Sequence, residues 1–302
     1  MIVVAGESLV DLIVDGLGHL RAVPGGGPFN TARTIARLGG KVAFLGRMSS
    51  DRFGADARAA LARDGVDLRY VEGTEDPTTL AVVEVDASGA ATYRFYVHGT
   101  ASAGLSAAAL PAVLASRPAA VHVGTLGLVL EPLATTVEAL ATGLDGSAVL
   151  MVDVNARPTA TPDPDAYRRR VARLLARADV VKASLEDLAF LYPGLEPGAA
   201  LDRAASAGPR VVLRTAGAGS LVIAMGERRR ELAVPVVPVV DTVGAGDAFG
   251  GGFLHAFIQA GGGRLHLDDT GAVATAAALG VRVAAITVGR TGAELPVGIH
   301  DR

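Results

Sequence analysis

The hydrophobic and polar positions of this 302-residue chain divide most of it into two kinds of segment. Short apolar runs rich in β-branched residues alternate with longer Ala- and Leu-rich runs whose apolar positions recur with helical spacing. Strands that alternate with helices imply helical crossovers, so we predict an α/β fold with a mainly parallel sheet and helices on both of its faces. The predicted strands are residues 2–5, 42–45, 120–123, 148–152, 179–182, 211–214 and 221–224, and the predicted helices are residues 30–38, 52–64, 107–115, 132–142, 165–177, 185–191, 245–260 and 270–281.

Two stretches, residues 9–23 and 79–97, depart from this rhythm. The first alternates apolar and polar positions around a Gly-rich middle, and the second has two such runs around residues 86–89, which is a hairpin signal. Alternation is typical of a sheet with one face in water. We therefore predict a small β-layer, a lid over a cleft, with Val82 and Val85 outside the central sheet. Since neither a repeat nor a linker divides the sequence, we expect residues 1–302 to form one domain with this discontinuous lid.

Composition then excludes several classes of protein. Half of the residues are hydrophobic and a fifth are charged, which is enough apolar mass for a core and unlike a disordered chain. The net charge of −3 argues against nucleic acid as a partner. The absence of cysteine excludes disulfide scaffolds, thiol catalysis and thiolate metal sites. No basic leader and no uncharged apolar run of about 18 residues is present, so we expect a cytoplasmic protein that does not enter a membrane.

The strongest chemical signal is the segment of residues 239–253, VVDTVGAGDAFGGGF. It predicts an apolar strand, a Gly-rich turn and then a helix, whose first N–H groups are unpaired and attract anions. Gly244 and Gly246 would let a phosphate or a developing oxyanion approach this backbone closely. Asp247 would then face the same space, where it could accept the proton of a hydroxyl that attacks a phosphate. The structural alternative is that Asp247 only complements the helix dipole. The segment matches neither the Walker A loop nor the Rossmann fingerprint.

A second Gly-rich turn, at residues 25–27, also precedes a predicted helix. Asn30 could cap this helix, or its amide and the nearby backbone could bind the hydroxyls of a polar ligand, and the segment alone leaves both interpretations open. A third signal is the run from Arg228 to Arg230, which lies between predicted strands. We interpret it as a solvated turn rather than a nucleic-acid-binding patch, because it is short.

Together the two Gly-rich segments resemble the signatures of the PfkB carbohydrate kinase family, whose members have a ribokinase-like fold. The C-terminal match, from Asp241 to Asp247, is the family's most specific signature, and the N-terminal match is Gly-Gly-x-x-x-Asn ending at Asn30. The resemblance implies a three-layer α/β/α domain with a mostly parallel central sheet and a small β-sheet lid. It also implies transfer of the γ-phosphoryl group of ATP to a hydroxymethyl group of a sugar. Further matches, in the family's order, are residues 38–39, 44–46, 51–54, 153–157, 181–186, 215–217 and 292–293.

The resemblance also implies roles for individual residues. Magnesium would accompany the ATP phosphates, and a monovalent cation such as K⁺ would bind partly to main-chain carbonyls. The implied sites are the catalytic base Asp247 with the anion-hole backbone of Gly244, Ala245 and Gly246; the sugar ligands Asp11, Gly26, Asn30 and Arg157; the nucleotide-site residues Thr215, Gly217 and Ser184; and the cation-site residues Asp241 and Val243.

Within the family, the Gly6-Glu7-x-x-x-Asp11 opening is similar to that of fructokinases, so fructose is the expected substrate. Two positions depart from the pattern. No Arg follows Tyr96, where fructokinases often carry one. The Asn-x-x-Glu motif linked to magnesium in ribokinases aligns with Ser184-x-x-Asp187. Because no Arg stands in residues 97–104 to grip a carboxylate, we expect neutral hexoses to be preferred over sugar acids.

Several alternatives remain open from the sequence. The same reaction could act on ribose, 2-keto-3-deoxygluconate or a nucleoside. A relative that binds sugar or nucleotide without catalysis is a second alternative, although the chain retains Asp247 and the glycines before it. A generic nucleotide-binding domain is a third, and it would leave the N-terminal Gly-rich segment without a role. The exposed face of the lid is expected either to shield the sugar or to form a homodimer.

Overall fold

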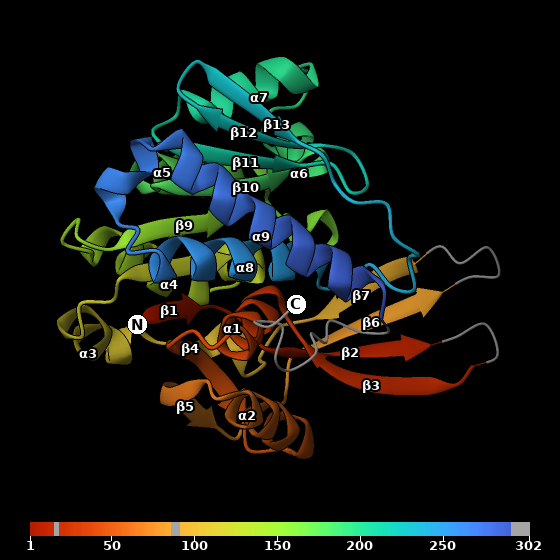
Figure 1. The fold of residues 1–302 in the computed structure, drawn as a ribbon. Helices are drawn as coiled ribbons and strands as arrows, with labels where there is room; N and C mark the ends of the chain where they lie inside the picture. Colours follow the sequence, from red (N-terminus) through yellow and green to blue (C-terminus); the bar gives the residue numbers. More distant parts are fainter. Residues whose placement is uncertain (15–17, 86–90, 291–302) are drawn as a thin grey trace.

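A nine-stranded sheet forms the centre of the protein in the computed structural model, which describes residues 1–14, 18–85 and 91–290 (Figure 1). Its order is β13-β12-β11-β10-β9-β8-β1-β4-β5, and all neighbours are parallel except at β12 and β13. The valine-rich strands in its middle are buried on both faces, as parallel strands between helical layers require. The strands are β1 (Ile2–Ala5), β4 (Val42–Ser49), β5 (Asp67–Thr74), β8 (Ala120–Gly124), β9 (Val149–Asp153), β10 (Val180–Ser184), β11 (Val211–Thr215), β12 (Leu221–Met225) and β13 (Arg228–Leu232).

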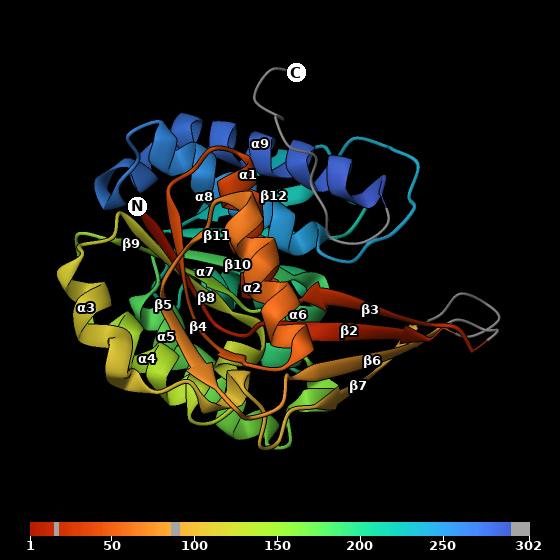
Figure 2. The same ribbon diagram turned by 90° about the horizontal axis from the view of Figure 1, so that it is seen from below.

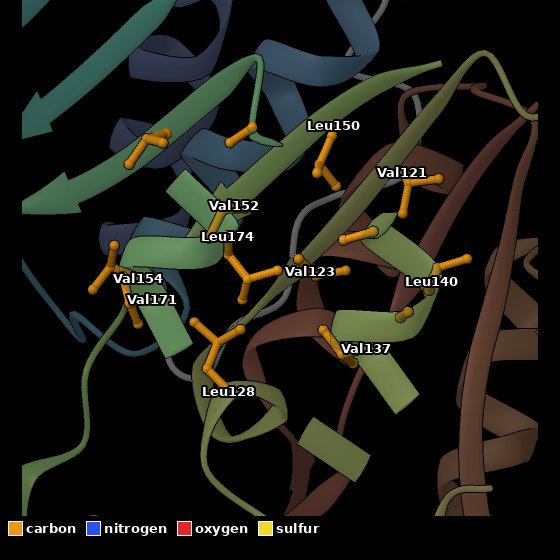
Figure 3. Packing of buried hydrophobic residues seen from close by; sticks show 14 of the residues in the cluster. Val121, Val123, Leu128, Val137, Leu140, Leu150, Val152, Val154, Val171 and Leu174 are labelled. Atoms are coloured by element: carbon orange, nitrogen blue, oxygen red, sulfur yellow. The ribbon is translucent and has the colours of Figure 1, made fainter. Parts of the chain in front are cut away.

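Helices cover both faces of this sheet (Figures 1 and 2). One apolar cluster packs α1, α2, α8 and α9 on the first face, and a second packs α3 to α7 on the other. Figure 3 shows the second cluster, in which Val121 and Val123 of β8 lie against Val137 of α4. The helices are α1 (Gly27–Arg37), α2 (Arg52–Asp64), α3 (Leu110–Ala115), α4 (Leu133–Gly143), α5 (Pro164–Arg177), α6 (Leu185–Leu191), α7 (Pro197–Ala205), α8 (Ala245–Gln259) and α9 (Thr270–Val288).

The lid is a separate four-stranded sheet beside the main body (Figure 2). Its strands β2 (Leu9–Val14), β3 (Leu20–Gly25), β6 (Leu80–Val85) and β7 (Ala91–Tyr96) have the order β3-β2-β6-β7. Val82 pairs with Leu12 and Arg94, and Val85 pairs with Ala91. The prediction that the two stretches form a β-layer outside the central sheet is therefore confirmed. Residues 15–17 and 86–90, which include the hairpin turn predicted at residues 86–89, lie outside the described residues, as does the predicted match at residues 292–293.

The edges of the main sheet differ from the sequence-based prediction. The run from Arg228 to Arg230, expected as a solvated turn, forms strand β13, which pairs with β12 and remains exposed. The three arginine side chains of this edge strand are exposed to water. Their charge discourages another chain from pairing with the edge. Strand β5 at the opposite edge and helix α7 were also missed. Strand β5 is only partly buried and therefore lacks the continuous apolar run of the central strands.

A second correction concerns the segment before α8. The apolar strand expected at Val239 and Val240 does not form: residues 233–240 pair with no sheet, and both side chains are more than half exposed. Instead, the N–H of Val240 donates to the main-chain carbonyl of Val288 at the end of α9, at 2.8 Å. A β-branched run becomes a strand only beside an available sheet edge, and here the chain crosses to a helix end.

Helix α9 is long and apolar enough, by length and composition, to cross a membrane. It packs lengthwise against α8, and its side chains Val273, Ala277 and Val281 belong to the buried core beneath it. A core helix passes the same length and composition test as a membrane span, so this single helix is weak evidence for one.

Candidate active site

A cavity of about 220 Å³ lies between the carboxyl ends of the central strands and the lid. This is the edge of an open α/β sheet at which ligands bind in general. The segments that follow β1, β8 and β9, the first turns of α1 and α8, and the lid strands β2 and β7 all contribute to its wall. Its lining residues are Glu7, Leu9, Asp11, Gly26, Gly27, Asn30, Tyr93, Phe95, Thr125, Leu126, Asn155, Arg157, Thr242, Val243, Gly244, Gly246 and Asp247.

Asp247 lies in the first turn of α8, at the floor of this cavity, and is 7% exposed. The amide of Asn30 donates to its Oδ2 at 2.9 Å, and the amide of Asn155 approaches its Oδ1 at 3.5 Å. Burial raises the pKa of Asp247 to about 6, while the hydrogen bond from Asn30 lowers it. The group is therefore mostly ionised at pH 7 and remains basic enough to accept a proton.

The backbone just before Asp247 forms the expected turn. Gly244 has a φ of 75°, a left-handed conformation that glycine adopts without strain, and α8 starts at the next residue. No side chain caps this helix start. The N–H of Ala245 donates to the main-chain carbonyl of Thr242 at 3.3 Å, and the N–H groups of Gly246 and Asp247 that follow remain available to an anion. Lys182 lies behind the turn: a Cβ added at Gly246 would lie 3.2 Å from its Nζ. This ammonium is buried and donates to both oxygens of Asp153 at 2.9 Å.

A second cavity, of about 130 Å³, lies on the other side of the same turn. Gly246 lines both cavities, so the start of α8 separates them. The wall of the second cavity is mainly apolar, and small residues such as Ala216, Gly217 and Gly219 form part of it. Such a wall suits a flat aromatic ring. It is lined by Thr215, Ala216, Gly217, Gly219, Leu221, Val234, Ala245, Gly246, Phe249, Val281 and Ala284.

The structure decides between the two interpretations of Asn30. The N-cap of α1 is Gly26, and the Asn30 amide reaches across to Asp247 rather than to the helix start. The Oδ1 of Asn30 is buried and has no hydrogen-bond partner. An unsatisfied buried acceptor in a cavity wall is costly unless a ligand donates to it, so Asn30 fits a ligand hydroxyl.

Most of the residues predicted for the site meet at these two cavities, but two of them, Ser184 and Asp241, do not. Ser184 lines neither cavity, because its hydroxyl accepts from the N–H of Asp187 and caps α6. Asp187 uses both carboxylate oxygens on backbone donors, the N–H groups of Ala156 and Ser184. Asp241 does not line the cavity under the lid, although Val243 does, and its carboxylate accepts from the N–H of Val243 at 2.9 Å.

Sequence reasoning assigned no site role to several residues of the cavity wall, among them Thr125 and Tyr93, and also Glu7 and Asn155, which lie within the family matches. Glu7 gave the clearest signal, since it interrupts an otherwise apolar segment. Its buried carboxyl accepts from the N–H of Gly27 at 3.2 Å and from that of Gly127 at 3.1 Å. It thereby joins the start of α1 to the turn that follows β8.

Burial raises the pKa of Glu7 to about 8, and it raises that of Asp11 to about 6. A carboxyl whose pKa is higher in the folded than in the unfolded protein binds its proton more tightly when folded. Its contribution to stability is complete below its ordinary pKa of 4.5 and is lost as the pH rises to about 8.

We therefore expect Glu7→Gln to gain stability relative to the parent protein as the pH is raised from 5 to 8. The free energy of unfolding, measured by urea denaturation at both pH values, checks this. The exposed control Glu227→Gln should follow the parent at both. An equal pH dependence of the parent protein and Glu7→Gln would contradict the raised pKa.

The comparisons with known proteins agree with this geometry. The pfkB family carbohydrate kinase model matches residues 1–299. A fructokinase from Klebsiella pneumoniae is 37% identical over 255 residues, which cover 83% of this chain and 82% of that protein. The structure resembles a fructokinase from Xylella fastidiosa with bound ATP, with a TM-score of 0.89, 27% identity and coverage of 97% and 93% of the two chains. It also resembles a fructokinase from Vibrio cholerae O395 with bound fructose, ADP and calcium ion, with a TM-score of 0.85, 28% identity and coverage of 97% and 94%. The expected ribokinase-like fold is thus confirmed, and the chain belongs to the pfkB family of carbohydrate kinases.

Proposed function

We propose that this protein phosphorylates D-fructose, transferring the γ-phosphoryl group of ATP to a hydroxymethyl group of the sugar. The observation that carries this proposal is the position of the α8 start. Gly246 lines both the polar cavity under the lid and the apolar cavity beside β11, and Asp247 lies on the sugar side of that boundary. A phosphoryl group that passes between two ligands would cross at this point. The fructokinase relatives support fructose as the acceptor.

In the proposed reaction, the sugar lies under the lid with its hydroxyls on Asp11, Gly26, Asn30 and Arg157. Asp247 takes the proton of the attacking sugar hydroxyl while the oxygen of that hydroxyl bonds to the γ-phosphorus. The bond between the γ-phosphorus and the β–γ bridging oxygen breaks, and ADP is released. The N–H groups at Gly244, Ala245 and Gly246 stabilise the charge on the transferred group. The buried ammonium of Lys182 adds positive charge behind them.

The adenine ring is proposed to occupy the cavity lined by Thr215 and Gly217. Magnesium enters with ATP as part of the substrate. Among the described residues no group of three or more His, Asp or Glu side chains could hold a metal ion, and magnesium in kinases is held largely by substrate phosphates. Asp241 and Val243 are proposed to bind a monovalent cation such as K⁺.

The assembly and the cellular setting are also proposals. We propose that residues 1–302 act as one cytoplasmic kinase domain, and that two copies pair through the lid. Leu20 and Tyr96, on the two edge strands β3 and β7 of the lid sheet, are exposed apolar side chains that such a lid-mediated homodimer would cover.

A neutral sugar fits the sugar-side cavity better than a sugar acid does. Three carboxyl side chains, those of Glu7, Asp11 and Asp247, line it together with the guanidinium of Arg157. Arg157 already uses Nη1 on carbonyl oxygens of its own loop. A carboxylate substrate would therefore meet more negative than positive charge.

The test is ATP consumption over a panel of acceptors that contains fructose, ribose, 2-keto-3-deoxygluconate and a nucleoside. We expect fructose to have the highest kcat/KM. Asp11→Ala should raise the KM for fructose about 10- to 100-fold, since a hydrogen bond to a charged group contributes about 1.5–3 kcal/mol.

The control Asp56→Ala, at an exposed ion pair on α2, should keep the parent KM. A preference for the sugar acid would reject fructose while leaving the kinase assignment intact. The absence of ATP consumption with every acceptor would instead favour a binding protein without catalysis.

A further inference from the structure

The loop that follows β9 holds Asn155 in an unusual backbone conformation. Its φ of 34° is positive, which is uncommon for a residue other than glycine, although asparagine tolerates it better than most. Thr125, which follows the neighbouring strand β8, also has a positive φ, of 54°. The two side chains meet: the Asn155 amide donates to the Thr125 hydroxyl oxygen at 3.2 Å. Backbone strain of this kind persists only where surrounding contacts enforce it, and it gathers at functional sites.

The surrounding contacts are present on both sides of Asn155. The N–H of Val154 donates to the main-chain carbonyl of Lys182 at 2.9 Å, and the N–H of Ala156 donates to Asp187 Oδ1 at 2.7 Å. Arg157 closes the loop by donating from Nη1 to the main-chain oxygens of Asn155 and Ala156. These bonds fix the loop backbone without using the Asn155 side chain, which lines the cavity.

Arg157 also determines which way the Asn155 amide points. Its Nη1 donates to Asn155 Oδ1 at 2.7 Å, a contact that only the carbonyl side of the amide can accept. The NH₂ side must then face the other direction, where it lies 3.2 Å from the Thr125 hydroxyl and 3.5 Å from Asp247 Oδ1. Asn30 meanwhile donates to Oδ2. Each carboxylate oxygen of Asp247 thus faces one amide donor and keeps further lone pairs for a substrate proton.

We propose that Asn155, oriented by Arg157, is a positioning residue that aims the Asp247 carboxylate and favours its charged form. This inference rests on the proposed role of Asp247 as the base. The long 3.5 Å contact is typical of a site without substrate, since catalytic hydrogen bonds often shorten only in the reactive complex.

Charged groups face Asp247 from several elements. Asp153 at the end of β9 raises its pKa, while Lys182 of β10 and Arg157 lower it. Glu7 after β1 and Asp11 of β2 lie within electrostatic reach of the same carboxylate. Against this background, a donor at Asn155 stabilises the ionised form, and an acceptor at that position would destabilise it.

Two substitutions at Asn155 separate the effect of its amide donor from the effect of the loop conformation. Asn155→Gly tolerates the positive φ and removes the amide. Asn155→Asp preserves the shape and the acceptor for Arg157, but replaces the donor that faces Asp247 with a second carboxylate. The measurement is the pH profile of kcat/KM for fructose, whose acid limb reports the ionisation of the free enzyme's base.

We expect the apparent pKa of that limb to rise by about 0.5–1 unit in Asn155→Gly and by more in Asn155→Asp. Turnover at neutral pH should fall about tenfold in Asn155→Gly, with the KM for ATP unchanged. Arg157→Met should raise the apparent pKa of the acid limb when it is made in the parent protein. It should raise this pKa less in the Asn155→Gly background, since the two side chains act as one unit.

A merely structural role predicts that Asn155→Asp behaves like the parent protein, because it keeps the loop contacts. An unshifted acid limb in both Asn155 variants, folded by circular dichroism, would overturn the inference. Asp247→Asn separates the positioning role of Asn155 from the proposed role of Asp247 as the base. If that variant is inactive while the Asn155 variants are normal, only the positioning role fails, whereas an active Asp247→Asn would refute the proposed base itself.

Discussion

Replacing Asp247 with asparagine is expected to lower turnover with ATP and fructose by about 10²–10⁴-fold or more, the usual value of general-base catalysis. The substitution keeps the size and shape of the side chain and removes its ability to accept the proton of the attacking hydroxyl. The cavity proposed for the nucleotide, on the other side of the α8 start, does not include Asp247. Binding of an ATP analogue, measured by calorimetry, should therefore remain close to that of the parent protein.

The pH profile of the parent protein gives a second measurement of the same role. Burial raises the pKa of Asp247 to about 6, so kcat/KM should fall as the pH drops through about 6 and the carboxylate takes up a proton. The control Asp56→Asn, at an exposed ion pair on α2, should retain parent turnover. Near-normal turnover in Asp247→Asn would show that another group takes the proton.

The second large effect is expected at Gly246, where valine should abolish most of the activity while the fold remains. The backbone of Gly246 is not left-handed, in contrast to that of Gly244, so the effect comes from space rather than from φ. A Cβ at Gly246 would lie 3.2 Å from Lys182 Nζ. The two further methyl groups of valine would displace this ammonium or enter the boundary between the two cavities.

A graded series tests this account. Gly246→Ala should have a smaller effect than Gly246→Val, because the end of a lysine side chain can move by a few tenths of an ångström. Gly250→Ala is the matched control one turn further along α8, since its Cβ would make only ordinary contacts of 3.4 Å or more. Thermal unfolding should confirm that all three variants are folded. Parent kinetics in Gly246→Val would mean that this turn does not face the transferred phosphate.

The elements with strong local signals were predicted most accurately. The bounds of α2 and α6 match the prediction, because Asp51 and Ser184 cap these helices with hydrogen bonds to residues three positions further on. The continuous apolar runs also located the central strands within one or two residues, apart from β4, which extends further. Each of these signals lies within a few residues of the element that it specifies.

The failures lie where the environment decides the structure. The Arg228–Arg230 run is a strand only because β12 offers it an edge, and the apolar pair Val239 and Val240 is not a strand because no edge lies beside it. Strand propensity depends on the available partner more than on the residues themselves. A polar run and an apolar run were therefore assigned the wrong way round.

By itself, the sequence determined the fold class and the chemistry of the site: a glycine turn at a helix start followed by a carboxylate, with a second glycine turn and an amide near the N-terminus. These are local arrangements, and a few adjacent residues are enough to specify them. Only the tertiary structure decided which of these groups meet. Asn30 and Asn155 reach Asp247 across 217 and 92 residues of chain. These contacts depend on the strand order that places the ends of β1, β8 and β9 side by side. The raised pKa of Asp247 likewise has burial as its largest cause, and burial exists only once distant segments have packed together.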